Sequence, residues 1–69
     1  MNQTAIILKH LEEFGSITAA EAVEQYGCHR LASRIKELRL LGHEIATDTE
    51  VGKNRYNKYV RYARYRMEN

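Results

Sequence analysis

Residues Thr18–Gly42, TAAEAVEQYGCHRLASRIKELRLLG, carry the most informative pattern in the chain. Thr18 is followed three residues later by Glu21, and T-x-x-E is the capping-box pattern, in which a hydroxyl and a carboxylate each accept a backbone N–H at a helix start. The pattern predicts a helix over about 19–25 with Ala22, Val23 and Tyr26 facing inward. Gly27 then ends the helix, because glycine readily adopts a positive φ.

A second helix is predicted directly after this glycine, over about Cys28–Leu41. Leu31, Ile35 and Leu38 recur at steps of four and three residues, which is the spacing of a core-facing stripe. Two helices joined by a tight turn are typical of a helix-turn-helix, whose second helix can enter the DNA major groove.

The outer face of this second helix carries the candidate base-reading residues. An arginine can bond both acceptors of a guanine at once, and the first half of a recognition helix usually lies deepest in the groove. The predicted base-reading residues are His29, Arg30, Ser33 and Arg34, and Lys36 is predicted to lie near the DNA backbone. Alternatively, Arg30 and Arg34 pair with Glu37 or Glu24 and hold helices together, and His29 is only an exposed first-turn residue.

Another helix is predicted before this pair, over residues 3–14. Its apolar stripe comprises Ile7, Leu8, Leu11 and Phe14. Asn2 or Thr4 is expected to cap its start, and Gly15 to end it. His10 is expected on the helix surface, and Ile17 as a core plug in a very short strand.

The last third of the chain predicts a β-hairpin. His43–Thr49 alternates like a strand, Glu50–Asn54 carries turn residues, and β-branched and aromatic residues favour a strand over about Val60–Tyr65. Ala63 and Tyr65 are expected to face inward. The tyrosines of this region are interpreted as strand-packing residues, unless several are exposed on one face, which would favour single-stranded nucleic acid.

Positive charge is concentrated in the same region. Residues 1–52 hold five Lys or Arg against eight Asp or Glu, whereas residues 53–69 hold six against one. A cationic segment on an acidic body indicates an anionic polymer as partner, although cations also protect strand edges. The candidate residues for contacts to the DNA backbone or minor groove are Lys53, Asn54, Arg55, Lys58, Arg61, Arg64 and Arg66.

Several functional classes are disfavoured by composition. The 69 residues predict a single domain, 1–69, with little room for a substrate pocket. The single cysteine and three scattered histidines predict no metal site and no cofactor, and no nucleophile–base pair suggests an enzyme. No apolar run reaches the roughly 18 residues of a membrane span. With no signal-peptide pattern at the N-terminus, a cytoplasmic location in a bacterial host is expected.

The predicted order of elements gives an α+β fold, a winged helix-turn-helix of three helices followed by a two-stranded β-hairpin wing. The motifs GSITAAEA (Gly15–Ala22), YGCHRLASRIKELRLLG (Tyr26–Gly42) and YARYR (Tyr62–Arg66) resemble those of small winged helix-turn-helix proteins of bacteriophages and prophages. The resemblance covers about residues 3–66. It implies DNA binding and a phage or mobile-element origin.

The sequence therefore predicts sequence-specific binding to double-stranded DNA, as a phage transcriptional regulator or an excisionase-like architectural factor. Specificity is expected from residues 29–36 and affinity from residues 53–66. Such proteins often act as homodimers or cooperative arrays. The alternative is a protein-interaction module that binds a host protein, which the acidic first 52 residues would allow.

Overall fold

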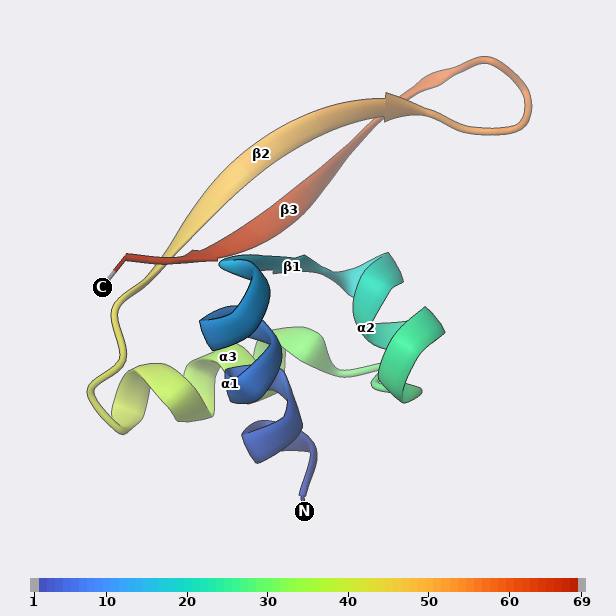
Figure 1. The fold of residues 1–69 in the computed structure, drawn as a ribbon. Coiled ribbons are helices and arrows are strands. Elements are labelled where there is room, and N and C mark those ends of the chain that lie inside the picture. Colours follow the sequence, from blue (N-terminus) through green and yellow to red (C-terminus); the bar gives the residue numbers. More distant parts are fainter. Residues whose placement is uncertain (1, 69) are drawn as a thin grey trace.

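A computed structural model describes residues 2–68 and shows a twisted sheet lying over three helices (Figure 1). Two strands form a long hairpin that runs well past the helices and ends in a loop at the far end of the molecule. The elements are α1 (Gln3–Phe14), β1 (Ser16–Thr18), α2 (Ala19–Tyr26), α3 (Leu31–Leu40), β2 (Ile45–Lys53) and β3 (Tyr59–Met67). The predicted α+β architecture, with three helices before a β-hairpin, is confirmed.

The sheet is antiparallel and has the strand order β1-β3-β2. β3 pairs along its whole length with β2, so that Thr47 lies opposite Tyr65. β1 pairs only with Arg64–Arg66, and Ile17 lies opposite Tyr65 on that side. The predicted two-stranded hairpin is thus joined by a third, short strand, and the part of β3 from Tyr59 to Ala63 pairs with β2 alone.

The hydrophobic core lies between the helices and the base of the sheet. Its buried members come from the three helices, from β1 and β2, and from the turn before α3: Ile7, Leu11, Ile17, Ala22, Cys28, Leu31, Ile35, Leu38 and Ile45. Leu8, Tyr26, Tyr65 and Met67 pack against this cluster from outside. The predicted stripe of α3, the stripe of α1 as far as Leu11, the core plug at Ile17 and the inward orientation of Tyr65 are confirmed.

The capping interactions of α1 and α2 form as the sequence predicts, which explains why the ends of these helices could be predicted. Thr18 Oγ1 accepts from the Glu21 N–H at 3.2 Å, and Glu21 Oε1 accepts from the Thr18 N–H at 2.9 Å, so the capping box is formed. Gly27 ends α2 with a φ of 64°. Asn2 caps α1 by accepting the Ala5 N–H at 2.8 Å.

His10 was predicted at the surface, and this prediction is wrong. Its side chain is only 5% exposed, because α1 turns it toward the end of α2. There its Nδ1 lies 2.6 Å from the hydroxyl of Tyr26, so the buried ring has a hydrogen-bond partner. Two residues predicted to face the core are instead exposed: Phe14 and Val23. Phe14 is the last residue of α1, where little core remains to cover it.

Two predicted boundaries also need correction. α3 begins at Leu31 rather than Cys28, because the buried Cys28 side chain fixes the turn and Arg30 has a non-helical φ of −124° and ψ of 51°. β2 continues to Lys53, so the hairpin tip is Asn54–Lys58 and not 50–54. The turn residue at the tip is Asn57, whose φ is 63°.

Candidate nucleic-acid interface

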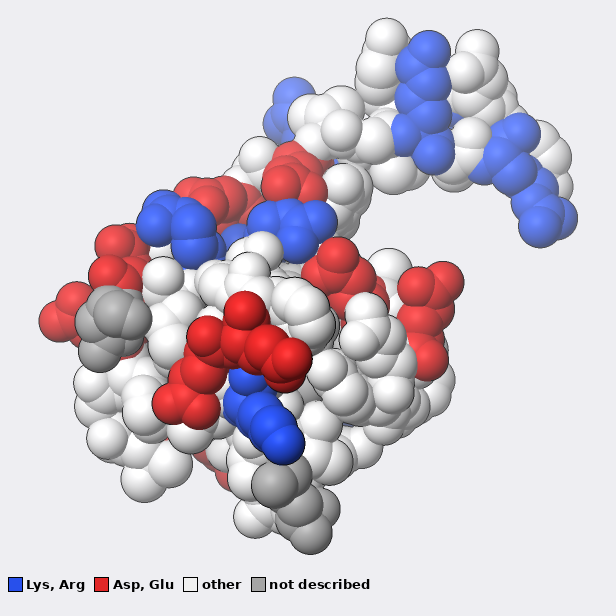
Figure 2. Space-filling view, in the orientation of Figure 1, with Lys and Arg blue, Asp and Glu red and all other residues white. Residues whose placement is uncertain are grey.

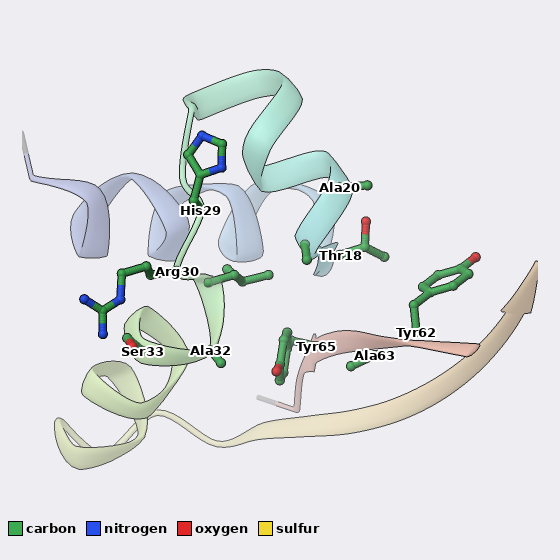
Figure 3. A pocket seen from close by; sticks show the side chains of 11 residues that line it. Thr18, Ala20, His29, Arg30, Ala32, Ser33, Tyr62, Ala63 and Tyr65 are labelled. Atoms are coloured by element: carbon green, nitrogen blue, oxygen red, sulfur yellow. The ribbon is translucent and has the colours of Figure 1, made fainter. Parts of the chain in front are cut away.

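A cleft of about 500 Å³ separates the helix-turn-helix from the wing strand β3 (Figure 3). One wall comprises the start of α2, the turn before α3 and the first turn of α3, and the opposite wall comprises the middle of β3. The lining residues are Thr18, Ala19, Ala20, His29, Arg30, Leu31, Ala32, Ser33, Tyr62, Ala63 and Tyr65. We refer to this feature as the cleft.

Three of the four predicted base-reading residues lie together on the helical wall of the cleft. His29 and Arg30 are exposed residues of the turn, and Ser33 is half-buried on the first turn of α3. The sequence placed His29 and Arg30 on the helix itself, whereas the structure places them just before it. Both side chains are therefore carried by a turn that the buried Cys28 anchors in the core.

Arg34, the fourth predicted base-reading residue, does not line the cleft. Its Nη2 lies 2.7 Å from Glu37 Oε1, and Glu37 also accepts the Thr4 hydroxyl of α1 at 3.0 Å. The Arg34 Nε is buried without a hydrogen-bond partner among residues 2–68. This geometry favours the alternative that Arg34 helps to hold α3 against α1. Lys36, predicted near the DNA backbone, is exposed on α3.

The sequence did not identify the lining residues of the opposite wall. Tyr62 and Ala63 line the cleft in the part of β3 that β1 does not pair with, and Tyr65 lines it from the paired part, opposite Ile17. On the helical side, Ala19 and Ala20 line the cleft at the start of α2, and their small side chains leave space in it. Only the register of β3 against β1 and β2 reveals the opposite wall, and no local sequence signal encodes that register.

The base of the wing is held by a ladder of ion pairs. The guanidinium of Arg64 contacts Glu50 at 2.8 Å, Glu21 of α2 at 3.3 Å and the Ser16 hydroxyl at 3.2 Å. Arg66 contacts Asp48 at 2.9 Å. Two of the cations predicted to contact DNA are therefore engaged with carboxylates of the protein itself.

These contacts alter the acidity of the groups involved. The hydrogen bond from Arg64 lowers the pKa of Glu50, and the hydrogen bond from Arg66 lowers the pKa of Asp48. Each cation favours the ionised form of its carboxyl partner. A hydrogen bond to Glu50 also raises the pKa of Tyr62, since it stabilises the protonated phenol.

Beyond this ladder the wing is cationic. We define the distal wing as residues 51–62, which contain Lys53, Arg55, Lys58 and Arg61 and no Asp or Glu. All four side chains are exposed, and within residues 2–68 none forms an ion pair. Figure 2 shows basic side chains at the end of the projecting hairpin, whereas acidic side chains gather over the helical body. The predicted division into a basic wing and an acidic body is thus a division in space.

Asn54 has a structural position in the wing tip. Its Oδ1 accepts the backbone N–H of Tyr56 at 2.9 Å and that of Lys58 at 3.1 Å. The backbone adds a bond from the Asn54 N–H to the Lys58 carbonyl at 3.0 Å. These bonds hold the tip turn and present Arg55 and Lys58 on an ordered frame.

A helix-turn-helix beside a basic hairpin defines a winged DNA-binding domain. The family comparison agrees: the sequence model of the winged helix-turn-helix domain family matches residues 2–69, and the chain belongs to this family. Membership supports DNA as the partner. No curated protein and no solved structure matches the chain significantly.

The described residues contain neither a candidate metal site nor a candidate membrane-spanning helix. Residues 2–68 contain no group of three or more His, Cys, Asp or Glu side chains placed to hold a metal ion. None of the three helices has the length and apolar character required to cross a membrane.

Proposed function

We propose that the protein binds double-stranded DNA sequence-specifically, with the start of α3 in the major groove and the distal wing on the phosphate backbone or minor groove. The observation that carries the proposal is the position of the cleft. It brings His29, Arg30 and Ser33 opposite the strand that leads into four cations without an ion pair among residues 2–68. The start of α3 can thus contact base edges while the neighbouring distal wing contacts phosphates. Sequence-specific DNA binding needs both kinds of contact, because phosphate contacts position the protein and base contacts select the sequence.

Within this arrangement Arg30 is the principal base-reading residue. It is exposed, lines the cleft and forms no ion pair within residues 2–68, whereas Arg34 is held by Glu37. Its long side chain can reach the two acceptors of a guanine from the turn before α3. Ser33 and His29 have shorter side chains and would contact bases or phosphates beside it.

The role that follows from such binding is transcriptional regulation or an architectural role in recombination. Both roles need a small protein that occupies a defined DNA site. They differ in the bending of the DNA, because an architectural factor pays for deformation with additional contacts. Circular permutation of the bound site within a DNA fragment would distinguish them.

The test is selection of bound duplexes from a random pool, followed by affinity measurements on the selected site. Arg30→Ala is expected to weaken binding to that site about 5- to 150-fold, the range that corresponds to one bidentate base contact. Its binding to unrelated duplexes should change much less. Lys9→Gln is the matched control for charge, because Lys9 is an exposed cation of α1 away from the cleft.

Two results would contradict the proposal. The first is a failure of the wild-type protein to bind duplex DNA at low salt, and a specific host protein captured by the same surface would then support the protein-interaction alternative. The second is a pool that yields no preferred sequence, which would leave only non-specific binding. An equal loss of affinity in Arg30→Ala for selected and unrelated duplexes would remove Arg30 as a base-reading residue.

A further inference from the structure

We propose that the distal wing binds unpaired nucleobases, so that the protein also recognises single-stranded nucleic acid or the unpaired arms of a DNA fork. The inference rests on the proposed nucleic-acid function but assigns a second ligand to the wing. Its occupant is a single strand, which needs a cationic track for the phosphates and aromatic rings for the bases.

The aromatic rings of the wing are exposed rather than packed. Tyr56 is 76% exposed, Tyr59 is 75% exposed and Tyr62 is 41% exposed. Of the tyrosines, Tyr26 and Tyr65 pack against the margin of the core. The rings of Tyr56 and Tyr59 are therefore not part of the described core. An exposed tyrosine can bury a large area at low entropic cost when a flat partner stacks on it.

The charge around these rings matches a phosphate backbone. Lys53 Nζ lies 5.0 Å from the centroid of the Tyr59 ring, and the two residues face each other in the β2–β3 register. Arg55 and Lys58 flank Tyr56 on either side in the tip. Because the distal wing contains no acidic residue, all of its own charged side chains attract a polyanion.

The frame that carries the rings is ordered. The amide oxygen of Asn54 accepts two backbone N–H groups across the tip, including that of Tyr56. Tyr59 is the first residue of β3 and pairs with Lys53. A platform held in this way loses less conformational entropy on stacking than a disordered loop would lose.

The path for a strand continues from the tip into the cleft. Tyr59 and Arg61 lie on the same face of β3 as Ala63 and Tyr65, which line the cleft. β3 is paired only with β2 from Tyr59 to Ala63, so the side of the strand toward the helix-turn-helix is open there. A cleft of about 500 Å³ with Tyr62 at its edge falls in the size range that admits small flat ligands such as a nucleobase.

The experiment measures fluorescence anisotropy of the full chain with three labelled probes. The probes are an oligothymidylate of about 12 nucleotides, a paired duplex and a fork with two unpaired arms. The wild-type protein is expected to bind the oligothymidylate and to bind the fork more tightly than the duplex. The double variant Tyr56→Ala/Tyr59→Ala should lose about tenfold or more in affinity for the oligothymidylate, because base–aromatic stacking is sequence-tolerant and substantial. Its affinity for the duplex should fall less.

Matched variants separate stacking from other effects. Tyr56→Phe/Tyr59→Phe keeps both rings and should bind the oligothymidylate nearly as the wild type does. Phe14→Ala removes a ring that is 64% exposed on the acidic body and should leave binding unchanged. Circular dichroism of each variant checks the fold, which is expected to survive because both tyrosines are exposed.

Duplex binding without binding to the oligothymidylate would overturn this inference and leave the proposed function intact. Equal losses on duplex and single strand in the alanine double variant would also overturn it, since the rings would then contact sugars or phosphates generally. Failure to bind any probe would overturn both proposals. A uridine oligonucleotide of the same length distinguishes RNA from DNA as the strand, and tight binding to either supports stacking.

Discussion

Neutralising the distal wing should change the salt dependence of DNA binding by a predictable amount. In Lys53→Gln/Arg55→Gln/Lys58→Gln/Arg61→Gln, four exposed cations without ion pairs within residues 2–68 are removed. Each phosphate contact contributes about −0.9 to the slope of log affinity against log salt, so the slope should become shallower by up to about 3.6. Between about 50 and 200 mM salt, the wild type should lose about 100-fold more affinity than the variant.

The assay is an anisotropy titration with a labelled duplex at five or more salt concentrations. Lys58→Gln alone should reduce the slope by about 0.9, and Lys9→Gln, which removes the same charge from α1, should leave it unchanged. Duplex binding with an identical slope in the wild type and the quadruple variant would refute the reasoning. The phosphate contacts would then have to come from the helical body.

Three further predictions concern the fold that supports this surface. Tyr26→Phe leaves the buried His10 Nδ1 without its partner and should lower the free energy of unfolding by about 1–3 kcal/mol in urea titrations. Thr18→Ala removes the capping box of α2 and should cost about 1 kcal/mol in the same assay, whereas an unchanged midpoint would contradict the capping role. Asp48 and Glu50 have a lower pKa folded than unfolded, so their contribution is present above the unfolded values of 3.8 and 4.5 and is lost as pH falls below them. The thermal midpoint should therefore decrease through this acidic range, and replacing both carboxylates with amides should flatten the decrease.

The features that the sequence predicted correctly are those with local signals. The capping box of Thr18 and Glu21 and the positive φ of Gly27 involve residues close together in the chain, so α2 and its end were readable. The stripe of Leu31, Ile35 and Leu38 likewise reports one helix face. Such patterns need no knowledge of the neighbouring elements.

The features that the sequence missed depend on partners far away in the chain. His10 is buried against the end of α2, where Tyr26 supplies a hydrogen-bond partner from another helix. Arg64 is a structural cation because the register of the hairpin places Glu50 beside it and because Glu21 of α2 lies within reach. A shift of one residue in that register would move every side chain of the strand to the other face of the sheet. The sequence did not determine the register, because the length of the turn alone is not sufficient to predict it.

The register also explains how a small protein carries a rigid and highly charged wing. Both acids of β2, Asp48 and Glu50, share a strand face with Arg64 and Arg66, so one face of the hairpin neutralises itself while locking the wing to the body. On the alternate face no acid opposes Arg61. The excess positive charge of the hairpin therefore lies in the distal wing, where its side chains are exposed and can bind a polyanion. Since the wing is already ordered, binding would not have to offset the entropy of folding it, and the attraction of its cations would be opposed mainly by the ordering of their own side chains and by the cost of association itself.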